Sequence, residues 1–454
     1  MTNGRTGESW EQIEAIVGQG DAAALDSFLD TLSPAEVARA VSRLDDESQA
    51  AVLTLLEPGD AADLLEELTD AQGADILEEL SALQAAAIVD EMESDERADV
   101  LAELDDEDAE AILAKMDPEE ARDARQLLAY PEDTAGGLMV TEFLCFSQSL
   151  SVADVLDDLR RNVERYSDYS VQYAYVLGDT GTVVGVLRLH DLVLSPSNAP
   201  LTSVMIANPL YALVTTPLAE LEQLFDRYTF TGLPVVDEKG QMVGVVRRAD
   251  VEEAQGERAE EALMRFGGII GGEELRSMSV ASRAFRRLSW LIVNLALSLG
   301  AASVILVYKD TVEHIIELAF FIPVIGNMSG CSGNQAVAVS IRELTLGLIQ
   351  PRDFVRVLIK EAQVGVLNGL ALGLLLGTVA FIWLHDPVFS LVVGGALAAN
   401  TLVALGLGGL VPLALRKLKA DPALAAPLAV TTIADMCGFF LVLSMACAFV
   451  VGAL

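Results

Sequence analysis

Five long apolar runs in the C-terminal part of the chain constrain its fold more than any other feature. A helix needs about 20 largely apolar residues to cross the hydrocarbon core of a bilayer, and each run reaches that length. The runs lie near residues 288–307, 315–339, 363–384, 389–415 and 424–451. The sequence therefore predicts an α-helical membrane domain of five spans over residues 283–454.

The loops between these runs predict their orientation. Basic residues gather before the first run, between the second and third, and between the fourth and fifth, whereas the two alternate loops carry one base between them. Lys and Arg are enriched in cytoplasmic loops. We therefore expect a multi-pass protein with its N-terminal half in the cytoplasm and its C-terminus outside.

The second run is unusually polar for a membrane span. Residues 322–335 read IPVIGNMSGCSGNQ, with a proline, three glycines and several amides and hydroxyls. Such sequence survives at membrane depth only where it is buried in protein or lines water. It predicts a segment that packs against or lines a pore, with Asn334 and Gln335 supplying amides. Interhelical hydrogen bonding without ion contact is the alternative.

Asp435 is the only acid well inside a span. It lies about 11 residues into the fifth run, roughly 16 Å deep at 1.5 Å per residue, near the midplane. A carboxyl at that depth marks an ion or substrate path by default; the alternative is a protonated acid bonded between helices. Thr431 lies one turn earlier, and no basic residue inside a span can neutralise Asp435. The predicted counter-charge is a hard divalent cation such as Mg²⁺.

The charge of the chain is concentrated in its first part. Residues from 276 onward carry 12 Lys and Arg against 9 Asp and Glu, which leaves 58 acids and 17 bases before them. This acidity argues against a nucleic-acid partner and favours cations, although it could also serve solubility alone. The four cysteines and three histidines do not cluster, so neither a disulfide framework nor a zinc site is predicted. The first residues lack an apolar signal-peptide core, and no catalytic constellation is present, so an enzyme is not expected.

A twelve-residue period organises the first 130 residues. Each apolar anchor is followed by a polar helix start, as in SPAE and DPEE, and then by a short apolar stretch. Short helices that cannot bury their faces alone stack into a superhelix, so residues 1–130 are predicted to form a helical N domain. The anchors are Leu32, Leu44, Leu56, Leu68, Leu80, Met92, Leu104 and Met116.

Residues 131–250 change to a strand–turn–strand–helix pattern that occurs twice, about 60 residues apart. This pattern resembles a tandem pair of CBS domains, an α/β module that often binds adenine nucleotides. Asp191 and Asp250 match the family's ribose-binding aspartates. Arg188 and Arg247 stand where the family commonly has Ser or Thr, so a structural or cation-linked role is the alternative to ATP binding. A long acidic helix is expected over residues 251–282.

Nearly the whole chain resembles the MgtE family of magnesium channels. The similarity rests on the order of the domains, on YPEDTAGGLM, on PVIGNMSGCSGNQ and on TTIAD. It implies a homodimeric, Mg²⁺-gated Mg²⁺ channel of the bacterial inner membrane, in contact with lipid. Its pore residue would be Asp435, helped by backbone oxygen near Thr431. Ser329 and Cys331 depart from the family's Gly and Asn, which puts the choice of ion in question.

Gating is expected to depend on acids that bind regulatory Mg²⁺ and so hold the pore closed. By position and resemblance these are Asp250, Glu253 and Glu261 on the connecting helix, with Asp421 on the membrane side. The repeat offers too many N-domain acids to choose among. The alternative functions are a proton-coupled transporter, a broader carrier of Co²⁺, Mn²⁺ or Ni²⁺, and a membrane-anchored scaffold.

Overall fold

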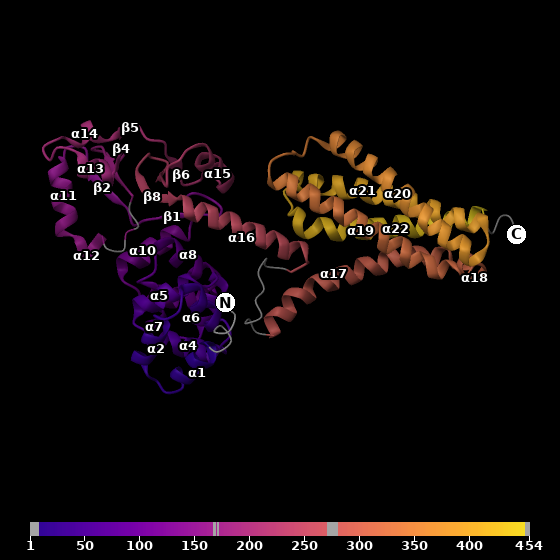
Figure 1. Cartoon of the computed structure of the whole chain (residues 1–454), viewed down its shortest axis with the longest axis horizontal. Helices are drawn as coiled ribbons and strands as arrows, with labels where there is room; N and C mark the ends of the chain where they lie inside the picture. The colour runs from indigo at the N-terminus through magenta and orange to yellow at the C-terminus, as the bar shows by residue number, and fades with distance from the viewer. Residues whose placement is uncertain (1–8, 167–168, 170–171, 270–279, 450–454) are drawn as a thin grey trace. The chain divides into compact units, whose positions relative to one another are not determined.

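The computed structural model describes residues 9–166, 169, 172–269 and 280–449. The chain divides into two compact units, one built from residues up to Arg258 and the other from Ala259 onward. The first unit contains short helices and two β-sheets, and the second contains long helices (Figure 1). The predicted multi-domain class, with helical, α/β and membrane-type helical parts, is confirmed.

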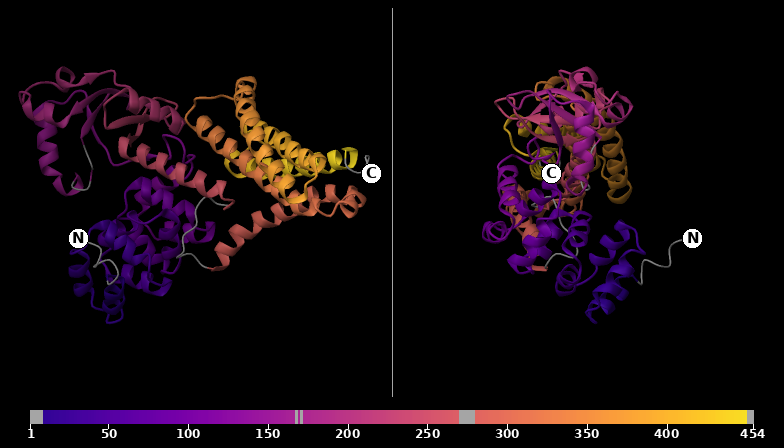
Figure 2. Two further views of the ribbon diagram at one scale, coloured as in Figure 1. Left: turned by 45° about the vertical axis from the view of Figure 1, so that its right-hand side comes forward. Right: turned by 90° about the vertical axis from the view of Figure 1, so that its left-hand side faces the viewer.

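The N-terminal part of the first unit is a stack of short helices. Local sequence starts them: Ser33 and Glu36 form a capping box before one helix, and Ser81 and Gln84 form another. Alternate helices pack on one another around a continuous apolar core. Figure 2 shows these short helices, in indigo and purple, gathered in one stack. The helices are α1 (Ser9–Val17), α2 (Ala22–Leu29), α3 (Pro34–Val41), α4 (Asp46–Leu55), α5 (Pro58–Glu66), α6 (Asp70–Glu78), α7 (Ala82–Val89), α8 (Ser94–Glu103), α9 (Asp106–Leu113) and α10 (Pro118–Leu127).

The twelve-residue anchors account for this stack. From the second anchor onward, each lies in the core of the helical stack or against it, at the end of one helix or in the turn that follows. A large apolar side chain at every turn therefore joins each short helix to its neighbours. The anchors in the core are Leu44, Met92, Leu104 and Met116, and those that pack against it are Leu56, Leu68 and Leu80.

Two four-stranded sheets follow, in the orders β2-β3-β4-β5 and β1-β8-β7-β6. In each, one parallel pair (β2 with β3, β6 with β7) adjoins antiparallel neighbours. The strands are β1 (Met139–Val140), β2 (Leu144–Ser147), β3 (Tyr173–Leu177), β4 (Val183–Arg188), β5 (Ile206–Ala207), β6 (Ala212–Leu213), β7 (Gly232–Val236) and β8 (Met242–Arg247). The helices between them are α11 (Val152–Arg161), α12 (Val163–Tyr166), α13 (Leu189–Leu194), α14 (Leu201–Val204) and α15 (Leu218–Arg227).

The helix after β8, α16 (Arg248–Phe266), begins in the first unit and ends in the second. It accounts for the first part of the connecting helix expected over 251–282, and residues 270–279 of that range lie outside the described residues. The second unit continues with α17 (Val280–Val307), α18 (Lys309–His314), α19 (Leu318–Thr345), α20 (Phe354–Leu384), α21 (Pro387–Lys417) and α22 (Pro422–Phe449).

Among the described residues, four helices are long and apolar enough to cross a membrane: α17, α20, α21 and α22. The predicted second span corresponds to α19, which is 28 residues long but carries the polar stretch. It nevertheless packs against α21 and α22 in the same bundle (Figure 1). The five predicted spans thus correspond to five long helices, four of which meet the criterion of length and composition.

Candidate ion path and acidic pocket

The polar stretch of α19 packs through its glycines against α22. A Cβ atom at position 326 would lie 3.0 Å from Oδ1 of Asp435, and one at position 333 would lie 2.6 Å from Cγ1 of Val430. At position 330, between them, it would lie 3.5 Å from Cγ2 of Thr431. Small residues let helices approach closely in membranes. The absence of a side chain at Gly326 therefore leaves the space that the Asp435 carboxylate occupies.

Asp435 and Thr431 lie one turn apart on α22, and α19 contacts both. Nδ2 of Asn334 donates to Oγ1 of Thr431 over 3.4 Å, and Oδ1 of Asn334 is buried with no hydrogen-bond partner among the described residues. Asp435 is half-buried, and no basic side chain of the described chain pairs with it. The structure thus brings together three of the four predicted pore residues.

Gln335 is the exception, because its side chain is exposed, unlike that of Asn334 beside it. Cys331 is also exposed, whereas its neighbour Gly330 faces α22. Ser329 is fully buried, and its hydroxyl has no partner among the described residues.

Sequence reasoning missed Asn400 in the middle of α21. Its side chain is completely buried, and Nδ2 donates to the carbonyl oxygen of Ala434, the residue before Asp435, over 3.0 Å. Gly438 makes room for it, because a Cβ atom there would lie 2.4 Å from Nδ2 of Asn400. A lone amide inside an apolar run was the available signal, since polar groups at membrane depth are costly and usually functional.

A small acidic pocket lies within the first unit, with a volume of about 60 Å³. Its walls come from the end of α5, the start of α6, one face of α8 and the first turns of α16. The predicted sensors Asp250 and Glu253 both line it. Its acids are Glu66, Asp70, Asp95, Glu96, Asp99, Asp250, Glu253 and Glu257.

Three carboxyls of α8 show how poorly this pocket tolerates negative charge. Burial, reinforced by neighbouring acids, raises the pKa of Glu96 to about 9 and that of Asp99 to about 8. Burial also raises the pKa of Asp95 to about 7, although Arg247 opposes the shift. Desolvation and like charges both disfavour the ionised carboxylate, so the pocket is electrostatically suited to a cation.

The fit of the pocket to a metal ion rests on the chemistry of its walls. The available ligand atoms are carboxylate oxygens, which hard cations prefer. Within the described ranges, however, no three acidic, histidine or cysteine side chains converge closely enough to bind one ion directly. A hydrated ion, which reaches its ligands through water, suits the wider spacing.

The other two predicted sensors, Glu261 and Asp421, meet in the second unit through an arginine. Nη1 of Arg265 lies 3.2 Å from Oδ2 of Asp421, and Nη2 pairs with Oε1 of Glu261. Oδ1 of Asp421 also accepts from the backbone NH of Ala423 over 2.8 Å, at the start of α22. Phe266, the last residue of α16, packs in an apolar cluster with residues of α19, α21 and α22. The end of α16 is thereby fixed to the helices that carry the polar segment and Asp435.

A larger cavity of about 320 Å³ lies between the two CBS-like sheets. Its wall includes Tyr173, Tyr175, Thr231 and Arg247, and the hydroxyl of Tyr175 is buried with no partner in the described chain. Neither aspartate predicted to hold a nucleotide is among its lining residues. Asp191 pairs instead with His190 over 2.8 Å, and Asp250 lines the acidic pocket.

Comparison with known protein families matches three parts of the chain. A model described as a divalent cation transporter (MgtE) matches residues 322–445, the MgtE intracellular N domain matches residues 32–133, and a CBS domain matches residues 201–257. The magnesium transporter MgtE of Thermus thermophilus is 32% identical over 325 residues, which are 71% of this chain and 72% of that protein. The magnesium transporter MgtE of Bacillus subtilis is 30% identical, over 71% of each chain.

Two solved structures resemble the first unit. The cytosolic domain of the Mg²⁺ channel MgtE in complex with ATP is 31% identical, with a TM-score of 0.50, and covers 54% of this chain and 99% of its own. The soluble part of a magnesium transporter has a TM-score of 0.51 at 22% identity and covers 56% of this chain and all of its own. The second likeness supports the fold alone.

Proposed function

The chain belongs to the MgtE family of divalent cation transporters, and we propose that it is a magnesium channel that cytosolic Mg²⁺ closes. The observation that carries this proposal is the position of Asp435. Its carboxylate lies against Gly326 within the helix bundle, with no basic partner in the described chain. An acid placed there needs a cation as its counter-charge.

The chemistry of the surrounding groups favours magnesium as the substrate. The polar groups near Asp435 include the hydroxyl of Thr431, one turn earlier, and the amide of Asn334, which donates to it; both are neutral and suited to contact water. Mg²⁺ sheds its hydration shell reluctantly and usually keeps several waters. In this proposal Asp435 holds the hydrated ion, and Thr431 and Asn334 orient its waters.

We propose a homodimer in which Asp435 of each copy faces a common pore. One chain supplies a single carboxylate at this depth, and two carboxylates balance a divalent ion. The dimer lies in the bacterial inner membrane with its acidic half in the cytoplasm, as the basic loops favour.

Gating is assigned to the acidic pocket. When Mg²⁺ is abundant, an ion bound among Glu96, Asp99 and Glu253 supplies the counter-charge that these acids lack, and this keeps α16 against α8. When Mg²⁺ is scarce, burying these acids without a cation is costly, and this loosens the contact. Because α16 also ends beside α19 and α22 through Phe266 and Arg265, a change at its first turns can reach the pore helices.

ATP is present in the cytosolic domain of the related Mg²⁺ channel. For this chain we place a nucleotide in the cavity lined by Tyr173, Tyr175 and Arg247, because that cavity has the aromatic walls and the unsatisfied Tyr175 hydroxyl. Asp191 and Asp250 do not line it and are not assigned to ribose binding.

The test is the Mg²⁺ current in inside-out membrane patches that contain the full chain. Asp435→Ala should abolish the current, whereas Asp310→Ala, in the short helix α18, should leave it at the wild-type level. Raising Mg²⁺ on the cytosolic face should close the wild-type channel, and the double variant Glu96→Gln/Asp99→Asn should weaken that dependence. Equal currents in wild type and Asp435→Ala would refute the assignment of the ion path.

The same patches separate the alternatives. A current carried by Co²⁺ or Mn²⁺ but not by Mg²⁺ would keep the channel and exclude the magnesium assignment. Uphill uptake that follows a proton gradient would instead identify a coupled transporter.

A further inference from the structure

Arg247, the last residue of β8, contacts carboxylates from two different domains. Nη1 lies 2.6 Å from Oε2 of Glu93 and Nη2 lies 3.0 Å from Oδ2 of Asp95, both in the helical N domain. Nε lies 2.9 Å from Oδ1 of Asp250, at the start of α16. The planar guanidinium presents its N–H groups in a fixed fork, so one side chain joins three acids in a defined geometry.

The first CBS-like repeat supplies an internal comparison. Arg188 ends β4 as Arg247 ends β8, and each stands three residues before an aspartate. Within the described residues, Arg188 makes no ion pair. The strand end therefore does not by itself require an arginine that pairs with the following aspartate. Arg247 differs from Arg188 because it also forms ion pairs with the N domain.

Arg247 divides the acidic pocket electrostatically. Asp95 is the most buried of the three α8 acids, with 5% of its surface exposed, and its Oδ2 lies 3.0 Å from Nη2 of Arg247. Glu96, Asp99 and Glu253 line the same pocket, and no basic side chain of the described residues forms an ion pair with any of them. One half of the pocket thus has a cation of its own, whereas Glu96, Asp99 and Glu253 have none among the described residues.

We infer that Arg247 is an internal cation that holds the N domain on the CBS pair without metal, so that a regulatory divalent ion acts only on the Glu96, Asp99 and Glu253 half of the pocket. This inference rests on the proposed gating by Mg²⁺. It deepens that proposal, because it assigns Asp95 and Asp250 to arginine and not to the metal. The contact between the domains is then partly independent of Mg²⁺, and the ion adds to it.

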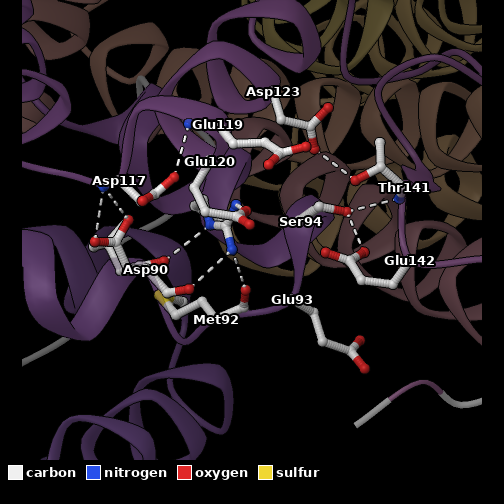
Figure 3. Close-up of polar contacts among 12 residues, drawn as sticks. Asp90, Met92, Glu93, Ser94, Asp117, Glu119, Glu120, Asp123, Thr141 and Glu142 are labelled. Atoms are coloured by element: carbon white, nitrogen blue, oxygen red, sulfur yellow. Dashed lines mark hydrogen bonds and ion pairs between the residues drawn. The ribbon is translucent and has the colours of Figure 1, made fainter. Parts of the chain in front are cut away.

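Hydrogen bonds from hydroxyl and backbone groups support the same contact and fix its geometry. Oγ of Ser94 donates to Oε2 of Glu142 over 2.6 Å and accepts from the backbone NH of Thr141 over 2.9 Å. Oγ1 of Thr141 donates to Asp123 over 2.5 Å. Figure 3 shows these groups beside Glu93. Because they do not involve Arg247, a variant at position 247 removes the charge and leaves these bonds available.

Hydrogen–deuterium exchange on the full chain in detergent tests the inference. The probe is α8, whose amides should exchange slowly while the N domain is held, and β7 reports on the CBS fold itself. Arg247→Thr removes the cation, and Arg188→Thr is the matched control at the equivalent strand end. Glu93→Gln removes one partner from the N-domain side and leaves the CBS sequence unchanged.

In EDTA we expect wild type and Arg188→Thr to protect α8 equally. Breaking a largely desolvated ion pair is strongly destabilising, so α8 of Arg247→Thr should exchange at least about tenfold faster, and Glu93→Gln should shift in the same direction. Mg²⁺ should restore much of the protection in Arg247→Thr. If β7 also exchanges faster in Arg247→Thr, that variant has lost its CBS fold. The exchange rate of α8 in Glu93→Gln then tests the inference in its place.

Equal α8 exchange in Arg247→Thr and Arg188→Thr would overturn the inference. So would a wild-type α8 that is unprotected in EDTA, because the arginine would then not suffice. Failure of the proposed gating gives a different result: Mg²⁺ would slow α8 exchange in none of the proteins, while the comparison in EDTA would still stand.

Discussion

Adding one methyl group at Gly326 should impair ion conduction without unfolding the protein. The new Cβ atom would lie 3.0 Å from Oδ1 of Asp435 and 3.2 Å from Cε1 of Phe439. An ordinary contact begins near 3.4 Å, so the carboxylate must retreat by about 0.4 Å or leave its rotamer. Alanine is otherwise favoured over glycine inside a helix by about 1 kcal/mol, so α19 itself is not weakened.

The size of the effect follows from this displacement. Forcing a side chain about 30° off its rotamer costs about 0.5–1.5 kcal/mol. Since about 1.4 kcal/mol corresponds to a factor of ten in rate, Gly326→Ala should reduce the Mg²⁺ current about two- to tenfold.

Gly330→Ala is the matched control, one turn along the same face of α19. Its Cβ atom would meet only Cγ2 of Thr431 at 3.5 Å, an ordinary van der Waals contact, so its current should stay near the wild-type level. Both variants should melt within a few degrees of wild type in detergent. Equal currents in the two alanine variants, at equal amounts of folded protein in the membrane, would show that the distance between Gly326 and Asp435 does not govern conduction.

Three further outcomes follow from the structure. Gly408→Ala should prevent correct folding of the helix bundle, because its Cβ atom would clash with the backbone oxygen of Gly333. Loss of the folded protein in size-exclusion chromatography would show this, and a normal yield would contradict it. Arg97→Leu should destabilise the N domain by about 3–5 kcal/mol in chemical unfolding, because three backbone carbonyls and a carboxylate lose the buried arginine as their donor. A change below about 1 kcal/mol would contradict the reasoning. In EDTA, the protection of α8 amides should fall as pH rises from about 5 to about 9, because Glu96 and Asp99 keep protons in the folded chain that the unfolded chain has released. Exchange rates corrected for the intrinsic effect of pH should show this fall. A flat profile would count against the raised pKa values.

The sequence by itself determined the features that repeat or that conflict with their surroundings. Apolar runs of span length predicted the long helices, and the twelve-residue spacing predicted the helical stack whose anchors line its core. Asp435 and the glycine-rich segment were visible because polar sequence at membrane depth needs a reason. These signals are local, so neighbouring residues are enough to reveal them.

The tertiary structure alone decided which distant groups meet. Gly326 faces Asp435, Arg247 reaches Glu93 154 positions away in the chain, and Asn400 finds the carbonyl oxygen of Ala434. Many N-domain acids are equivalent in sequence, yet only those on one face of α8 and at the adjoining helix ends share a pocket with α16. Such meetings depend on how whole helices pack, and a local pattern fixes the face of a helix but not the partner against which that face comes to lie.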